Sequence, residues 1–143
     1  MRRPMRRLRG GRGQTLVEFA LMMPLFALLL FGLLDFGRVV WAQNTVSEAA
    51  REASRVGIVS PSASSSKYDS IRSAAIQRGP GIGLTAGDVT GQSCADCFYP
   101  DGAASGGRVV VTVTKQIQLL TPIVAQVVGG SFTVSSTSRS FIP

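Results

Sequence analysis

The 143-residue sequence contains no histidine and only two cysteines. Without histidine, imidazole general bases and histidine-ligated metal sites are excluded. Structural zinc normally needs four ligands, so Cys94 and Cys97 alone do not make a zinc site. The serines are not accompanied by a histidine or lysine arrangement that would activate one of them as a nucleophile. We therefore expect no enzymatic activity, no metal and no cofactor.

Acidic residues are also scarce, and the excess of positive charge lies at one end of the chain. Lysine and arginine total 15 against eight acidic residues, and six of the arginines lie within residues 1–13, which contain no acid. Beyond Gly13, nine basic residues face eight acidic ones, without a basic stripe interleaved with aromatic residues. Such a stripe is what nucleic-acid binding requires. Nucleic acid is therefore not an expected partner.

A long apolar run follows the basic leader (residues 1–13). No charged or hydrogen-bonding side chain occurs from Phe19 to Leu34, and the run extends back to Leu16 if Glu18 is tolerated. A helix over these 19 residues is roughly 28 Å long, close to the roughly 30 Å hydrocarbon core of a bilayer. Arginines beside such a helix stay on the cytoplasmic side. We predict a transmembrane helix over residues 14–36 with a cytoplasmic N-terminus.

The same helix is predicted to continue to Gly57, so that residues 37–57 extend it beyond the membrane. Asp35 and Arg38 end the apolar run at a spacing of i, i+3, which lets them pair on one helix face. Trp41 suits the same boundary zone. An apolar stripe at alternating spacings of three and four follows: Val39, Ala42, Val46, Ala49, Ala53 and Val56. We interpret this stripe as the core face of its own domain; a contact with a helix of another subunit is the alternative.

Residues 58–143 are predicted to form a small domain outside the cytoplasm. A second helix is expected from Lys67 to Gly79, with Ser66 as its cap. Its buried side is expected to consist of Tyr68, Ile71 and Ala75. The glycine-rich stretch that follows lacks the lysine and hydroxyl residue of a phosphate loop, and it is expected to form turns.

Strand patterns occur in residues 88–93, 108–120 and 131–141, and a short helix can start at Pro122. The predicted fold class is therefore α+β. A long N-terminal helix, transmembrane in its first half, packs on a small antiparallel sheet.

Cys94 and Cys97 form a CxxC pair in a loop rich in glycine and serine. A thioredoxin-like redox pair would instead stand at the start of a helix that follows a strand. Disulfides persist outside the cytoplasm, so we expect these two residues to form a structural disulfide. Redox catalysis by the pair is the alternative.

The N-terminal features together resemble the TadE-like family, small membrane-anchored pseudopilins of tight-adherence (Flp-type) pilus systems. The features that carry the resemblance are, in order, Gly13, Glu18 five positions later, Pro24, Asp35, Arg38 and the AAREASR helix segment. The resemblance covers about residues 13–57. One residue departs from the pattern, because Phe19 follows the glutamate where Flp-type prepilins usually carry tyrosine.

The resemblance implies a pseudopilin-like fold and a prepilin-type leader. A prepilin peptidase would cut after Gly13 and leave Gln14 as the mature N-terminus, and Glu18 would pair with that amine on a neighbouring subunit. The alternative for Glu18 is that it lies at the headgroup boundary and its side chain extends back so that the carboxylate stays in water. The implied partners are the lipid bilayer, the peptidase, and other pilins or pilus-assembly membrane proteins.

We thus expect a single-pass protein of the bacterial inner membrane that acts in pilus assembly by helix packing. One rival is a Sec-exported soluble protein cleaved before Gln43. Against it, the apolar run exceeds the usual signal core of about 7–15 residues, and Asp35 and Arg38 intervene. The other rival is an orphan membrane-tethered domain with a redox CxxC pair.

Overall fold

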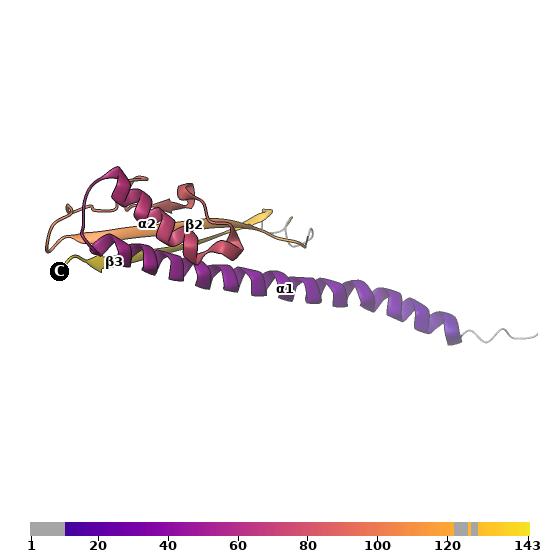
Figure 1. Cartoon of the computed structure of the whole chain (residues 1–143). Helices are drawn as coiled ribbons and strands as arrows, with labels where there is room; N and C mark the ends of the chain where they lie inside the picture. The colour runs from indigo at the N-terminus through magenta and orange to yellow at the C-terminus, as the bar shows by residue number, and fades with distance from the viewer. Residues whose placement is uncertain (1–10, 122–125, 127–128) are drawn as a thin grey trace, which may run out of the picture.

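The computed structural model describes residues 11–121, 126 and 129–143. The fold is α+β, as predicted: the second half of a long N-terminal helix packs on a small antiparallel sheet (Figure 1). Most of the basic leader and the short helix expected at Pro122 lie outside the described residues.

Helix α1 (Gly11–Ile58) is one continuous helix of 48 residues with Pro24 inside it. It extends the expected helix by a few residues at its start and ends at the expected place. Tyr99 on a distant loop donates a hydrogen bond from its hydroxyl to the Gly57 carbonyl, at 2.8 Å. This bond satisfies one of the carbonyls that a helix end leaves without an intrahelical partner.

Helix α2 (Ser65–Arg78) follows a short polar linker and ends at Gly79, as predicted. Its N-cap is Ser64 and not Ser66, because Ser64 is the last residue with extended backbone angles. The backbone N–H groups of Lys67 and Tyr68 both donate to the Ser64 carbonyl. The glycine-rich stretch after α2 forms two 3₁₀ turns, η1 (Pro80–Ile82) and η2 (Ala86–Asp88).

The sheet contains β1 (Val89–Thr90), β2 (Arg108–Gln118) and β3 (Ser131–Phe141), in that order and all antiparallel. The strand expected over residues 88–93 is much shorter than predicted. Gly91 N–H donates to the Cys94 carbonyl and Gln92 N–H to the Cys97 carbonyl, so the cysteine loop takes these donors from the ladder.

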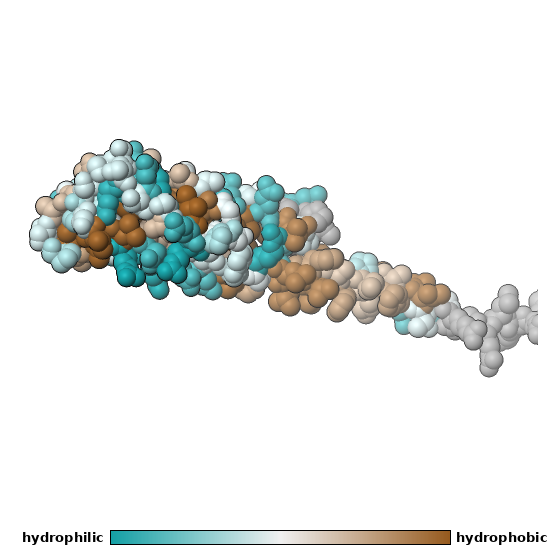
Figure 2. All heavy atoms as spheres, in the orientation of Figure 1, coloured by the Kyte–Doolittle hydropathy of each residue, from teal (hydrophilic) through white to brown (hydrophobic). Residues whose placement is uncertain are grey.

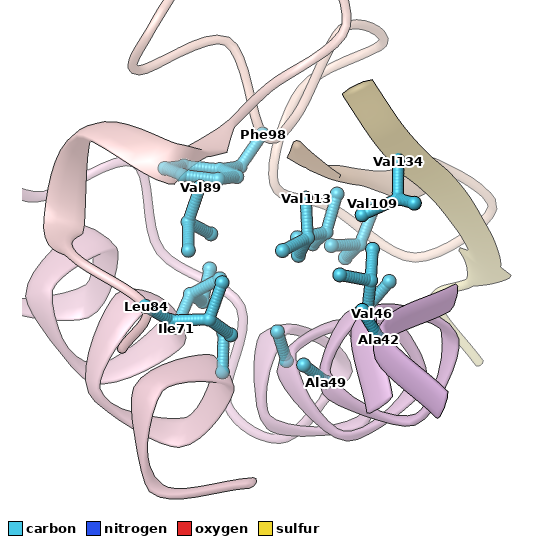
Figure 3. Packing of buried hydrophobic residues seen from close by; sticks show 14 of the residues in the cluster. Ala42, Val46, Ala49, Ile71, Leu84, Val89, Phe98, Val109, Val113 and Val134 are labelled. Atoms are coloured by element: carbon cyan, nitrogen blue, oxygen red, sulfur yellow. The ribbon is translucent and has the colours of Figure 1, made fainter. Parts of the chain in front are cut away.

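The hydrophobic core lies between α1, α2 and the sheet (Figure 3). The alanine-rich stripe of α1 faces it, which confirms the interpretation as a core face: Ala42, Val46, Ala49 and Ala53 are buried, and Val39 and Val56 at its two ends are half-buried. Ala50, outside the predicted stripe, is buried as well. The predicted buried side of α2 is confirmed, since Ile71 and Ala75 are buried and Tyr68 packs against the core. Val109, Val111 and Val113 of β2 complete the opposite wall.

Small residues on α1 allow the sheet to approach closely. A β-carbon at Gly57 would lie 2.6 Å from Val109 Cγ1, which is closer than atoms pack. At the neighbouring turn, Ser54 is buried and its hydroxyl lies 2.8 Å from the Ser138 hydroxyl of β3 and 3.2 Å from that of Ser140. We name the compact unit formed by residues 42–121 and 129–143 the head.

Candidate functional site

The first half of α1 projects away from the head, and its large hydrophobic side chains are exposed. We name residues 16–36 the apolar half of α1; within it, Leu21 is 72% and Leu29 is 64% exposed. Hydrophobic side chains cover the helix where it leaves the head (Figure 2). This is the one helix in the described part of the chain that is long and apolar enough to cross a membrane. An exposed apolar face of this size marks a surface that contacts lipid or protein.

Near the start of α1, the predicted leader residues lie on one helical stretch. Gln14 Nε2 donates to Glu18 Oε1 at 3.4 Å, one turn apart, and both side chains are exposed. The Gly13–Gln14 peptide bond lies inside the helix, two residues after its first residue. The roles assigned to Gly13, Gln14 and Glu18 stay predictions.

At the other end of the apolar half, Asp35 is only 3% exposed and is fully engaged. Its Oδ1 accepts a hydrogen bond from Leu120 N–H and its Oδ2 accepts one from Thr121 N–H, each at 3.0 Å. The predicted pairing of Asp35 with Arg38 is therefore wrong, because the carboxylate turns to the backbone that follows β2. No signal close to Asp35 in sequence points to these partners, since they lie 85 and 86 positions away.

Arg38 and Trp41 lie one and two turns beyond Asp35 and line a cleft of about 210 Å³ against the end of β2. Within the described part of the chain Arg38 has no ion-pair partner. Trp41 packs on Gly81 of η1, where a β-carbon would lie 2.5 Å from the indole Cη2. This cleft was not foreseen, because η1 and β2 reach the helix only in the fold.

The cysteine loop packs on α2, far from the apolar half along the chain. The structure joins Cys94 and Cys97 in a disulfide. Arg72 of α2 donates to the Ala95 carbonyl at 3.0 Å and pairs with Asp96 at 2.6 Å. The arginine also lies over the ring of buried Phe98, which follows the loop. The loop is therefore held as a structural element, and oxidation of the pair in the exported protein stays a prediction.

An ion pair fixes η2 to the sheet. Lys115 Nζ lies 2.9 Å from Asp88 Oδ2, and the N–H and hydroxyl of Thr85 also donate to that oxygen. Burial on its own raises the pKa of Asp88. The hydrogen bonds from Lys115 and Thr85 outweigh it, so the pKa lies below its usual value. The opposite holds for Tyr99, where burial raises the pKa of the phenol.

Together, the single apolar helix and the small α+β head fit a single-pass membrane protein. Residues 13–55 match the family model described as TadE-like protein, and the predicted resemblance is confirmed over this stretch. The match covers most of α1 and no part of the sheet. The TadE-like stretch thus connects the chain with tight-adherence pilus systems. No curated protein and no solved structure matches the chain.

Proposed function

We propose that the protein is a membrane-anchored minor pilin or pseudopilin that takes part in assembly of a tight-adherence pilus. The observation that carries the proposal is the division of α1 into two halves. The large hydrophobic side chains of the apolar half are exposed along its length, whereas one face of the second half is buried in the head. The TadE-like match spans the junction between them.

Assembly would proceed by helix packing and not by catalysis. The alanine-rich stripe is already covered by the sheet and α2, so it is not free to bind a neighbouring subunit. Contacts between subunits would then fall to the apolar half, which contacts lipid before assembly and other pilins or pilus-assembly proteins after it. An intramembrane carboxylate is costly without a partner, and Glu18 would be satisfied by the Gln14 amine of a neighbour.

The Sec-exported rival fits the structure less well. Cleavage before Gln43 would remove Asp35, which holds the chain after β2, and Trp41, which packs on Gly81. It would also remove Ala42, which is 1% exposed in the core. A signal peptide is removed after export, so residues that pack in the core or hold the chain after β2 are not expected within it. These contacts favour a helix that stays attached to the head.

N-terminal sequencing of the membrane-extracted protein tests the proposal. We expect the chain to start at Gln14 in cells with an active prepilin peptidase. Gly13→Ala should block cutting and leave the precursor in the membrane, whereas the control Gly10→Ala should be processed normally. A start at Gln43 would establish the secreted rival, and an uncut Met1 start would leave a plain membrane anchor.

The proposed location is the bacterial inner membrane, with the leader in the cytoplasm and residues 58–143 outside it. Six leader arginines against Arg38 on the other flank favour this orientation. A periplasm-active reporter fused after Pro143 should be active, while a cytoplasm-active one should not. Activity of the cytoplasmic reporter alone would overturn the orientation.

A further inference from the structure

We propose that the cleft between α1 and the end of β2 binds the phosphate of a phospholipid whose acyl chains lie along the apolar half of α1. The proposal rests on the proposed membrane anchor, since the lipid would come from the leaflet beside the head. The proposal is based on the cleft itself, on Arg38, which forms no ion pair among the described residues, and on the exposed leucines next to it on α1.

The cleft has the size and polarity for one headgroup. Its volume is about 210 Å³, and the residues that line it include Arg38, Trp41, Gly81, Gln116, Ile117 and Gln118. No acidic side chain lines it, and Arg38 is its sole charged group. A guanidinium binds phosphate oxygens through two parallel N–H donors, and side-chain amides can add further bonds.

Arg38 is available for this role because its natural partner on the helix is taken. Asp35, one turn earlier, has both carboxylate oxygens bound by the N–H groups of Leu120 and Thr121. Arg38 is exposed and has no ion-pair partner within the described ranges 11–121, 126 and 129–143. An arginine at the edge of an apolar helix then faces the level where lipid phosphates lie.

Trp41 forms a fixed wall of the cleft. Its indole packs against Gly81, where even a β-carbon would come within 2.5 Å of Cη2. The ring therefore contacts η1 on one side while remaining 52% exposed. Tryptophan combines an apolar ring with one N–H donor, which suits the boundary between acyl chains and headgroups.

Exposed leucines extend from the cleft along the apolar half of α1. Leu30, Leu34, Arg38 and Trp41 follow one another at spacings of four, four and three, so they lie on one face of α1. Leu30 and Leu34 are 43% and 54% exposed. A lipid with its phosphate on Arg38 would lay an acyl chain over these two leucines, and this continuity favours a phospholipid over a soluble anion.

The test uses the full-length protein in a neutral detergent and phosphatidylglycerol with brominated acyl chains. Trp41 is the only tryptophan, so quenching of its fluorescence reports on the cleft. We expect saturable quenching that unbrominated lipid reverses and inorganic phosphate does not. Arg38→Gln should weaken the lipid affinity about tenfold or more, as loss of a hydrogen-bonded charged group implies. Gly81→Ala should also weaken it, by displacing the indole.

Arg139→Gln is the matched control, because Arg139 is exposed on β3 and does not line the cleft. Equal quenching curves for Arg38→Gln and Arg139→Gln would overturn the lipid site, and displacement by inorganic phosphate would show a simple anion site instead. Carbonate extraction of cell membranes separates the two proposals. Release of the wild-type protein would overturn the anchor and with it the lipid, whereas retention without Arg38-dependent quenching would overturn the lipid site alone.

Discussion

The Asp35 carboxylate on α1 accepts a 3.0 Å hydrogen bond from the backbone N–H of Thr121, 86 positions further along the chain. Its other oxygen accepts from Leu120 N–H. One side chain thus ties the end of β2 to the helix at the point where the apolar half ends. The attachment fixes how the head lies against the end of the apolar half.

Removing this carboxylate should detach the end of β2. Asp35→Ala leaves two N–H groups without their acceptor, and we expect the free energy of unfolding to fall by about 1–3 kcal/mol. The free energy of unfolding of Asp35→Asn should fall by nearly as much, because the amide nitrogen of asparagine is itself a donor and cannot accept a hydrogen bond from a backbone N–H. Hydrogen exchange at Leu120 and Thr121 should accelerate in both. Asp69→Asn is the control, since the Asp69 side chain is 78% exposed. Equal protection of the Leu120 and Thr121 amides from exchange in all three variants would contradict the attachment.

The close approach at Gly57 predicts a cost for even one methyl group. In Gly57→Ala the new β-carbon would collide with Val109, and overpacking of this kind costs roughly 1–3 kcal/mol. Gly37→Ala lies in the same helix with no atom within 4 Å of its β-carbon, so it should be neutral or slightly stabilising. Thermal unfolding in detergent compares the two. A Gly57→Ala melting temperature at or above that of Gly37→Ala would refute the tight contact.

Acid should weaken the Asp88–Lys115 pair. The pKa of Asp88 is lower in the fold than its usual value of 3.8, so its carboxylate stabilises the fold above that pH. This stabilisation is lost as the pH falls through the lowered pKa. Asp88→Asn should therefore be destabilised by roughly 1–2 kcal/mol at pH 7, and the difference from wild type should shrink in strong acid. A difference that stays constant with pH would exclude this linkage; Asp69→Asn is again the control.

The cysteine pair should be oxidised in protein recovered from the cell envelope. Mass spectrometry without reduction should find both thiols protected from alkylation. Replacing both Cys94 and Cys97 by serine should cost about 2 kcal/mol or less, because so short a loop constrains the unfolded chain only modestly. Two free thiols in the envelope fraction would favour the redox alternative over a structural disulfide.

Glu18 is predicted to serve assembly and not insertion. Glu18→Ala removes a charge from the apolar region, so membrane insertion should be unchanged or easier. Cross-linking to partner pilins should fall sharply, because the Gln14 amine of a neighbour loses its acceptor. Glu48→Ala, an exposed carboxylate on the head, should cross-link normally. Normal cross-linking by Glu18→Ala would favour a glutamate that merely reaches back to water.

The sequence predicts best where a pattern is local and repeated. The limits of β3 follow from the alternation between Ser131 and Phe141, after Gly129 and Gly130, which both adopt positive φ. The buried stripe of α1 follows from its three-and-four spacing in the same way. These features depend on neighbours within a few positions, so they can be predicted from a single amino-acid sequence.

What escaped prediction depends on contacts between distant segments. The Asp35–Arg38 pair was reasonable by spacing, yet backbone donors after β2 compete better for the buried carboxylate. Val110 alternates with Val109 and Val111 along its strand, yet all three are buried, and the Val110 N–H donates to the Phe98 carbonyl of a distant loop. The cleft beside Arg38 likewise exists only once η1 and β2 reach the helix.

The continuity of α1 has a mechanical consequence. The helix runs unbroken from the apolar half into the core, and β2 and β3 lie alongside its second half (Figure 1). A pull on the anchor along the helix axis therefore loads the helix–sheet contacts in shear, all at the same time. Under such a pull each contact bears only part of the force. Under a force across the helix axis the contacts would instead break one after another, and each would bear the whole force in turn. The head would resist extraction forces along this axis better than forces across it.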